Sequence, residues 1–308
     1  MELIFLGTGA GVPAKERNVS ATALKWTERK GRTWLFDCGE ATQHQILHSP
    51  VKLGKVDHIW ITHLHGDHLF GLPGVLGSRS FQEAETPLTL FGPEGLRRFV
   101  DTVLTVSQTH LRYECEVREV TSGVVYEDDD VRVICAELDH GIPCFGYRIE
   151  EKDRPGSLRT DLLQALGVPP GPLYRRLKAG EDVRLPDGRM IRAREVLGPP
   201  KRGRIVTILG DTRPTEAAVR LASQADVLVH EATYRAREAA LAVKHGHATT
   251  VDAARTAERA GVRTLILNHI SPRYGVEDEP ELLAEARAIF PETYVARDGW
   301  CYSVISRD

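Results

Sequence analysis

Short apolar segments separated by glycine, proline or polar turns recur along the first half of the chain. Segments 2–6 (ELIFL) and 33–37 (TWLFD) are too short for typical helices and lie between turn signals, a pattern typical of buried strands. The same pattern predicts strands at 21–25, 56–62, 88–91, 115–120, 124–126, 131–137 and 145–149. Helices are expected at 40–48, from about Leu69 and at 94–106, with Pro73 close to the start of the second.

The second half changes to an alternation of strands and helices. Strands are expected at 204–209, 226–229, 264–268 and 293–296. Helices are expected at 214–224, 249–260 and 279–289, the first opening at Pro214 and the second at a Thr249–Thr250 cap. A β-rich half followed by an alternating half predicts one layered α/β domain over residues 1–308.

Residues 151–204 stand apart from this pattern. They contain repeated proline and glycine turns, such as Pro169-Pro170-Gly171-Pro172, which favour an extended excursion over a packed layer. They carry a net charge of +6, whereas the rest of the chain carries −9. We expect a flexible inserted arm that binds an anionic partner, with short structured pieces at 158–166 and 173–178. The alternative is a surface insertion without a role.

Composition narrows the class of protein. The net charge of −3 excludes a uniformly basic nucleic-acid binder, and no apolar run approaches the roughly 18 residues of a membrane helix. The N-terminus has no positively charged segment before its apolar residues, so we expect a cytoplasmic protein without a signal peptide. The five cysteines form no C-x-x-C pair and are expected to be reduced thiols.

The strongest chemical signal is the run His63-Leu64-His65-Gly66-Asp67-His68, at the end of the expected strand 56–62. Residues two apart on an extended segment point the same way, so His63 and His65 converge on one ion. The Gly66 turn then directs Asp67 and His68 to a second ion. Imidazoles and carboxylates suit zinc, and this ligand set leaves manganese open.

These side chains cannot complete two coordination spheres alone, so the remaining ligands are expected at other strand ends. The candidates are His140, Asp211 and His269, and Asp211 is suited to bridge both ions. Burying this cluster without metal would leave polar groups to satisfy for little gain. The isolated histidines are assigned no such role: His44, His48, His58, His110 and His245.

With these ligands in this order, the chain resembles the metallo-β-lactamase superfamily over nearly its whole length. The resemblance implies an αββα sandwich with the metal site at one edge. Flanking segments further resemble the ribonuclease Z family, with the insertion at 151–204 where that family carries a protruding arm. The matching segments are residues 5–9 (FLGTG), 13–18 (PAKERN), 36–43 (FDCGEATQ), 71–74 (GLPG), 230–233 (HEAT) and 247–249 (HAT). Ala248 departs from the serine that the family often has there.

The resemblance implies a zinc-dependent endoribonuclease that removes the 3′ trailer of precursor tRNA and leaves a tRNA 3′-hydroxyl. It also implies two Zn²⁺ per subunit and a homodimer. As a hypothesis, hydroxide between the two metals attacks phosphorus and Asp67 accepts the proton. His247 is the candidate general acid for the leaving group, oriented by Glu231. The candidate RNA-binding residues are Lys15, Arg17 and Asn18 in the first loop, and Arg175, Arg176 and Lys178 in the arm.

Two other readings remain open from sequence. One is a small-molecule hydrolase of the same fold, a phosphodiesterase, lactonase or thioesterase, which the arm and the 15–18 loop speak against. The other is a non-catalytic RNA-binding protein that keeps the fold, which the complete ligand set speaks against. Hydrolysis of a chromogenic phosphodiester compared with a lactone separates the enzyme readings.

Overall fold

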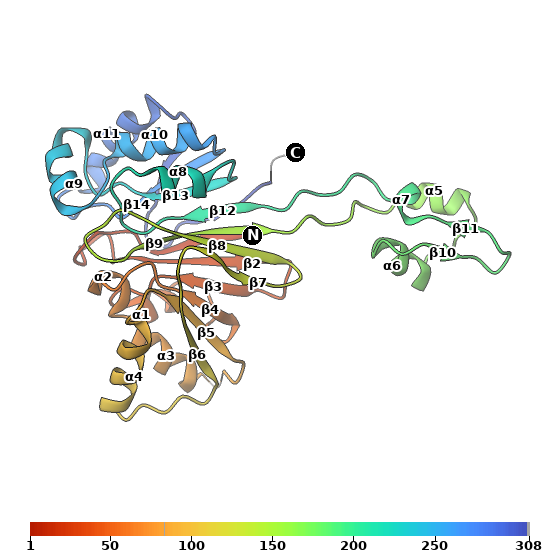
Figure 1. The fold of residues 1–308 in the computed structure, drawn as a ribbon, viewed down its shortest axis with the longest axis horizontal. Helices are drawn as coiled ribbons and strands as arrows, with labels where there is room; N and C mark the ends of the chain where they lie inside the picture. Colours follow the sequence, from red (N-terminus) through yellow and green to blue (C-terminus); the bar gives the residue numbers. More distant parts are fainter. Residues whose placement is uncertain (83, 307–308) are drawn as a thin grey trace.

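A computed structural model describes residues 1–82 and 84–306 of the chain. Two seven-stranded sheets lie face to face, and helices cover both outer faces (Figure 1). This is the αββα sandwich that the family resemblance implies. None of the helices in the described part of the chain is both long and apolar enough to cross a membrane.

The first sheet has the order β16-β1-β2-β3-β4-β5-β6. Strands β3 to β6 are parallel, and β1, β2 and β16 extend the sheet with antiparallel pairs. The strands are β1 (Glu2–Gly7), β2 (Ala21–Trp26), β3 (Arg32–Phe36), β4 (Val56–Trp60), β5 (Leu88–Gly92), β6 (Cys115–Glu119) and β16 (Cys301–Ser303).

The second sheet has the order β15-β14-β13-β12-β9-β8-β7, in which β12 to β15 are parallel. The antiparallel strands are β7 (Gly123–Glu127), β8 (Val131–Glu137) and β9 (Phe145–Glu151). The parallel strands are β12 (Ile205–Ile208), β13 (Val227–Glu231), β14 (Thr264–Asn268) and β15 (Thr293–Val295).

Helices complete the outer layers. The first sheet is covered by α1 (Thr42–Leu47), α2 (Gly66–Leu69), α3 (Leu72–Phe81) and α4 (Leu96–Val106). The second is covered by α8 (Glu216–Ala222), α9 (Ala239–His245), α10 (Thr250–Ala260) and α11 (Glu279–Arg287). Short 3₁₀ turns occur at Leu53–Lys55, Ala236–Glu238 and Val276–Asp278.

The centre of the molecule lies between the two sheets. Trp34, Trp60 and Phe91 from the first sheet meet Tyr147 from the second, and all four are fully buried. The rings of Trp60 and Phe91 stack with centroids 4.0 Å apart, which adds to the burial of their apolar surface. This core holds the two sheets in one orientation, and therefore fixes the strand ends that carry the polar residues.

The structure confirms most of the predicted elements and changes several boundaries. The predicted strand 56–62 ends at Trp60, because the Thr62 N–H and hydroxyl bond the Asp37 carboxylate instead of a strand. The helix expected from about Leu69 is two helices, α2 and α3, with Pro73 in the first turn of α3. Helix α8 begins at Glu216 with Thr215 as its cap, not at Pro214. The predicted Thr249 cap of α10 is present as a capping box, whereas α9 and β16 were not predicted.

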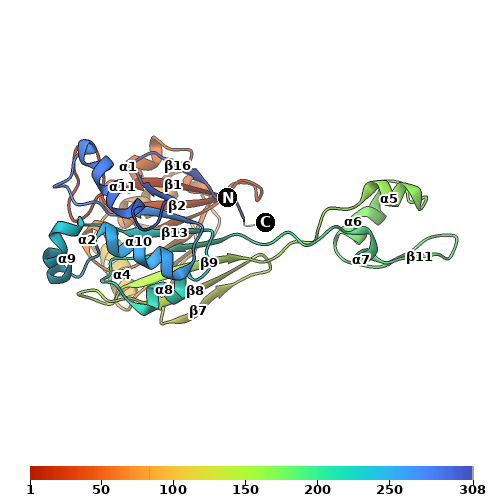
Figure 2. The same cartoon turned by 90° about the horizontal axis from the view of Figure 1, so that it is seen from above.

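The arm is a separate small module at the end of a two-stranded stalk (Figures 1 and 2). The stalk pairs through isolated antiparallel bridges, Arg154 with Lys201 and Leu158 with Leu197. Gly156 lies so close to Gly198 that a Cβ there would meet the Gly198 carbonyl oxygen at 2.0 Å. The module contains α5 (Thr160–Ala165), α6 (Pro172–Lys178), β10 (Val183–Arg184), β11 (Met190–Ile191) and α7 (Ala193–Val196).

The arm module has a hydrophobic cluster of its own, including Leu163, Leu177 and Val196, each fully buried. The expectation of an extended excursion without a packed layer is therefore wrong for the tip and right for the stalk. The proline and glycine turns that motivated it join short elements instead of preventing them.

Candidate metal centre

The predicted metal ligands meet at one rim of the sandwich because they follow the ends of neighbouring strands or begin new ones. His63 follows β4, Asp211 follows β12 and His269 follows β14, and these strands run toward the same rim. His140 lies just before β9, which runs antiparallel to β12 and so starts at that rim. The topology therefore brings together side chains separated by about two hundred positions in the chain.

His63, His65 and His140 form a first group of inward-pointing ring nitrogens. The Nε2 of His63 lies 3.1 Å from the Nδ1 of His65, which lies 3.2 Å from the Nε2 of His140. Three imidazole nitrogens at these separations can share one cation.

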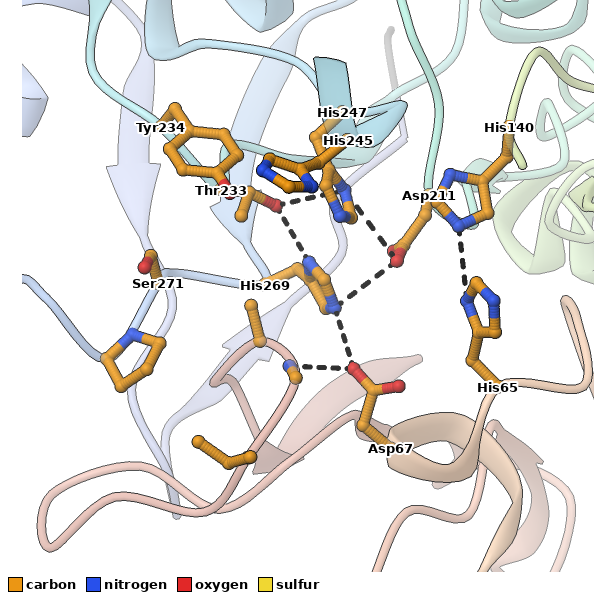
Figure 3. Close-up of a pocket in the computed structure, with 14 residues that line it drawn as sticks. His65, Asp67, His140, Asp211, Thr233, Tyr234, His245, His247, His269 and Ser271 are labelled. Carbon is orange, nitrogen blue, oxygen red and sulfur yellow. Dashed lines mark hydrogen bonds and ion pairs between the residues drawn. The ribbon is translucent and has the colours of Figure 1, made fainter. Parts of the chain in front are cut away.

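Asp67, His68 and His269 form a second group. The Nε2 atoms of His68 and His269 lie 3.2 Å apart, and Asp67 Oδ2 lies 3.3 Å from His269 Nε2 (Figure 3). The structure thus separates the hexapeptide into the two pairs expected from the sequence, His63 with His65 and Asp67 with His68.

Asp211 lies between the two groups. Its Oδ2 is 3.6 Å from His63 Nε2 in the first group, and its Oδ1 is 3.5 Å from His68 Nε2 in the second. It is 3% exposed. Its Oδ2 also lies 3.4 Å from His269 Nε2 in the second group, so this one carboxylate faces both groups and is placed to bridge two cations.

The outer nitrogen of four of the imidazoles is held by a protein oxygen. His63 Nδ1 lies 3.0 Å from Thr62 Oγ1, and His68 Nδ1 lies 2.7 Å from Asp37 Oδ2. His140 Nδ1 lies 2.7 Å from the Gly246 carbonyl oxygen, and His269 Nδ1 lies 2.8 Å from Thr233 Oγ1. These bonds fix the ring orientation and leave the inner nitrogen for a cation, as in most histidine metal sites.

The pKa values of His63 and Asp211 are shifted in the direction that metal binding requires. At His68, by contrast, burial is outweighed by the carboxylates of Asp211 and Asp37, which raise the pKa of the imidazole. Burial and the neighbouring His68 hold the pKa of His63 well below its ordinary value, which favours the neutral imidazole. Burial raises the pKa of Asp211, but the positive charges of His269, His68 and His63 outweigh it, and the net pKa is lowered. Neutral imidazoles and ionised carboxylates are the forms that coordinate divalent cations.

The residues present fit a two-cation site. Nitrogen and oxygen donors converge in two groups, one carboxylate faces both, and the outer ring nitrogens are held by protein oxygens. The buried imidazoles of His68 and His269, with facing nitrogens about 3 Å apart, would gain little from one another without a cation between them. Five of the donors are nitrogens, which suits zinc better than magnesium or calcium.

Next to the cluster, His247 and Glu231 form a hydrogen-bonded pair. The Nδ1 of His247 lies 3.0 Å from Oε1 of Glu231, which is 2% exposed. Glu231 also accepts hydrogen bonds from the N–H of Thr212 at 2.9 Å and from the hydroxyl of Thr233 at 2.7 Å. Burial lowers the pKa of His247, but the hydrogen bond and charge of Glu231 and the charge of Asp211 raise it to about 9. The Nε2 of His247 is thereby left to carry an exchangeable proton.

The segment His245-Gly246-His247 contributes both to metal binding, through His140, and to the candidate acid, His247. Gly246 has a positive φ of 79° and ends α9, and a Cβ at this position would lie 2.9 Å from His140 Nδ1. Glycine is therefore required both by the backbone conformation and by the close approach of His140. One short turn orients a candidate ligand and presents a candidate acid.

Ligands of both groups and the candidate acid line one open pocket of about 360 Å³ (Figure 3). Its lining includes His65, Asp67, His140, Asp211 and His247. An open polar pocket around a candidate two-cation site and an acid is suited to hydrolysis of a charged ester.

Comparison with known proteins identifies the family. The chain is 59% identical over 304 residues to ribonuclease Z of Geobacillus kaustophilus, with 99% of each chain covered. The chain belongs to the ribonuclease Z family. It is therefore an endoribonuclease that hydrolyses phosphodiester bonds.

Solved structures agree with this assignment. Human tRNase Z, short form, superposes with a TM-score of 0.73 at 28% identity, covering 99% of this chain and 100% of that one. The metallo-β-lactamase fold protein YhfI of Bacillus subtilis, at 18% identity and a TM-score of 0.68 over 98% of each chain, shares the fold. A family model described as anti-Pycsar protein Apyc1 matches residues 1–147.

The first loop, which the sequence predicts to bind RNA, has a larger structural role than expected. Arg17 is 5% exposed, and its guanidinium bonds the Thr8 hydroxyl, the Ala296 carbonyl and the Glu279 carboxylate. Asn18 donates its side-chain amide to the Glu40 carbonyl at 2.7 Å. Both hold the loop in place, so direct RNA contact by this loop stays a prediction for the exposed Lys15.

The candidate arm residues lie far from the metal centre. Arg175, Arg176 and Lys178 are exposed on α6, but two of them already have partners. Arg176 Nε bonds Glu181 Oε2 at 2.8 Å, and the Lys178 ammonium donates to the carbonyls of Pro155 and Gly156 in the stalk. Arg175 therefore offers the most available charge of the three.

The sequence does not predict the residues that hold the candidate ligands in place. Asp37, Thr62 and Thr233 each hold a candidate ligand, and nothing in their spacing reveals this. His245 was assigned no role, yet it lines the metal pocket together with Tyr234. Of the other isolated histidines, His58 belongs to the aromatic core and lies 5.6 Å from Phe91, ring to ring.

Proposed function

We propose that this chain removes the 3′ trailer from precursor tRNA and leaves a 3′-hydroxyl on the tRNA, using two bound Zn²⁺ ions. The observation that carries the proposal is the placement of the Glu231–His247 pair beside seven convergent ligands, five of which line one open pocket together with His247. Relatives named ribonuclease Z match over 99% of the chain, arm included. Human tRNase Z, whose name refers to tRNA, shares the fold over its whole length.

The two cations would be held by His63, His65 and His140 on one side, by Asp67, His68 and His269 on the other, and by Asp211 between them. When bound, such a pair supplies an activated water as nucleophile and stabilises the charge that accumulates on phosphorus. Asp67, whose carboxylate faces the pocket, is placed to accept the proton of that water. Asp67 would then act both as a metal ligand and as the base.

His247 completes the reaction at the leaving group. Cleavage that leaves a 3′-hydroxyl breaks the bond between phosphorus and O3′, and the departing oxygen needs a proton. Glu231 keeps His247 charged near neutral pH and holds its ring, so Nε2 can donate that proton. Thr233 and Thr212 keep Glu231 in place by donating to its two oxygens.

The direction of the arm supports two proposals, that the arm holds the RNA and that the enzyme is a dimer. It leaves the body after β9 and returns before β12, whereas the ligands of these strands, His140 and Asp211, lie at their opposite ends (Figures 1 and 2). An arm that points away from its own pocket would hold RNA that is cleaved in a second copy. We therefore propose a homodimer, working in the cytoplasm where precursor tRNA would be encountered.

Incubation of the purified protein with precursor tRNA labelled at its 5′ end tests the proposal. We expect one shortened product with a 3′-hydroxyl, loss of cleavage with chelator, and recovery on adding Zn²⁺, with Mn²⁺ in parallel. A chromogenic phosphodiester and a lactone serve as comparison substrates. Turnover of the lactone without cleavage of the precursor would favour the small-molecule hydrolase instead.

A further inference from the structure

One wall of the metal pocket is lined by two side chains that are neither candidate ligands nor the candidate acid, and a third side chain, outside the lining, lies against one of them. Tyr234 and His245 stack with ring centroids 6.5 Å apart and an interplanar angle of 26°. The guanidinium carbon of Arg273 lies 5.0 Å from the Tyr234 centroid. Figure 3 shows Tyr234 and His245 beside His247, on the side of the pocket away from His65 and Asp67.

The protein fixes this wall in place. Tyr234 is only 8% exposed, its N–H bonds the Ala248 carbonyl, and its carbonyl accepts from the Thr250 N–H at 3.0 Å. Arg273 Nε donates to Ser271 Oγ at 3.2 Å, which holds its guanidinium near the ring. His245, the last residue of α9, and Arg273 are exposed, whereas Tyr234 is buried. A preformed ring surface with accessible members is suited to receive another planar group.

Planar groups of this kind bind nucleic-acid bases. Bases stack on Tyr and His rings and on Arg guanidinium planes with little dependence on sequence. Arg273 adds a positive charge beside the same ring, which favours a phosphodiester chain. The metal ligands cannot do this, because their ring nitrogens face one another.

We infer that Tyr234, His245 and Arg273 form a subsite for the base of the nucleotide immediately 5′ of the scissile phosphate. The inference rests on the proposed function and assigns one nucleotide of that substrate to one wall. The proton from His247 must end on O3′ of this nucleotide, so its ribose lies beside His247. The Tyr234 ring is 6.0 Å from the His247 ring, so the attached base reaches the wall.

A substrate series with single abasic positions tests the subsite on the metal-loaded enzyme. We expect loss of the base 5′ of the scissile bond to lower kcat/KM about 10-fold, as one base stack would. Loss of the base 3′ of the bond should have no such effect. In His245→Ala and Tyr234→Leu, removing the 5′ base should cause no further fall, whereas Tyr234→Phe should keep the wild-type sensitivity. Lys244→Ala, an exposed neighbour in α9, is the matched control.

A second readout does not depend on turnover. A precursor with 2-aminopurine 5′ of the bond, and a methylene group replacing O3′, binds without being cleaved. Its fluorescence should be quenched by the wild type and by Lys244→Ala, and less by His245→Ala.

Sensitivity only at the 3′ base, or sensitivity that persists in both His245→Ala and Tyr234→Leu, would overturn the subsite and leave the proposed function standing. Absence of precursor cleavage by the wild type would overturn the proposed function and the subsite with it. An equal loss in Lys244→Ala would also overturn the subsite, because the effect would then belong to α9 as a whole.

Discussion

At the metal-centre rim, side chains are held by buried hydrogen bonds from several strands, whereas the arm carries its charges on an exposed surface. Asp211 and His68 are 3% and 2% exposed, and His68 is held by Asp37 at 2.7 Å. The arm has a small core of its own, and the bridges at Arg154 and Leu158 help to hold its stalk. Catalysis requires that the catalytic side chains have fixed positions. Electrostatic attraction of a polyanion depends much less on the exact positions of the charged side chains. Substitutions at the rim should therefore change metal content and kcat, and substitutions in the arm should change KM and salt dependence.

Asp211→Asn should have the largest effect, because Asp211 is the carboxylate that faces both ligand groups. Replacing it removes a negative charge between two cations, so we expect loss of at least one metal ion per chain. Cleavage of precursor tRNA and of a small phosphodiester should fall together, by roughly 10³-fold or more, if both cations act on the phosphate. Elemental analysis and parallel kinetics measure the two effects. Full metal content with unchanged kinetics would remove Asp211 from the site.

His247→Ala should leave the metal content unchanged and lower kcat for precursor tRNA by about 10²- to 10⁴-fold, the range for a general acid. A substrate with a p-nitrophenolate leaving group needs no proton at the departing oxygen and should lose much less. His48→Ala, at the exposed residue that caps the C-terminus of α1, is the matched control. Equal losses on both substrates would indicate a positioning role for His247.

These rim residues differ in how far sequence could predict them. The hexapeptide from His63 to His68 shows its chemistry through spacing alone, and the ends of predicted strands were sufficient to select His140, Asp211 and His269. Asp37 and Thr233 gave no such signal, because their roles depend on hydrogen bonds across the sandwich. The structural role of Arg17 was hidden for the same reason, since its partner Glu279 lies 262 positions away.

In the arm, the boundaries could be predicted from the sequence but the internal packing could not. Its boundaries followed from composition and charge, and the strands that flank it end and begin at Glu151 and Ile205. Its packed tip was not predicted, because turn residues every few positions mask the apolar spacing of a small core. Leu163, Leu177 and Val196 lie on different short elements and meet only in three dimensions.

Replacing residues 155–200 with a short flexible linker should separate binding from chemistry. We expect KM for precursor tRNA to rise by about 10- to 100-fold and its salt dependence to weaken, because phosphate contacts are lost. Turnover of a small phosphodiester should change little, since the candidate ligands and the Glu231–His247 pair all lie outside residues 155–200. Equal losses on both substrates would show that the two regions depend on each other.

Mixing this arm deletion with His247→Ala tests the dimer. Each chain alone is impaired, but a mixed dimer joins an intact pocket to an intact arm on the other chain. Recovered cleavage on mixing, with co-elution of the two chains, would support action across the dimer. If cleavage does not recover, the arm of each chain would have to hold the RNA for the pocket of the same chain.

Glu231→Gln should move the alkaline limit of kcat to lower pH. The negative charge of Glu231 helps to raise the pKa of His247 to about 9, and the acid must be protonated to act. The proton is therefore present below that pKa and is lost as the pH rises through it. Without the charge, the limb should shift by one to two pH units toward the ordinary histidine value of about 6.5. A pH profile of kcat, with thermal melting to verify the fold, measures the shift, and an unmoved limb would assign it to another group.

The smallest expected effect compares two adjacent arginines in the arm. Arg175 is exposed on α6, whereas Arg176 is paired with Glu181 at 2.8 Å, so its charge is partly neutralised before RNA arrives. Arg175→Gln should weaken RNA binding a few-fold and reduce the salt slope by about one, as expected for one lost phosphate contact. Arg176→Gln should do less, and Glu181→Gln should strengthen binding by freeing Arg176. Binding measured at several salt concentrations distinguishes the three variants. Equal losses for the two arginines would show that the pair opens when RNA binds, and that the charge of the arm acts as a whole.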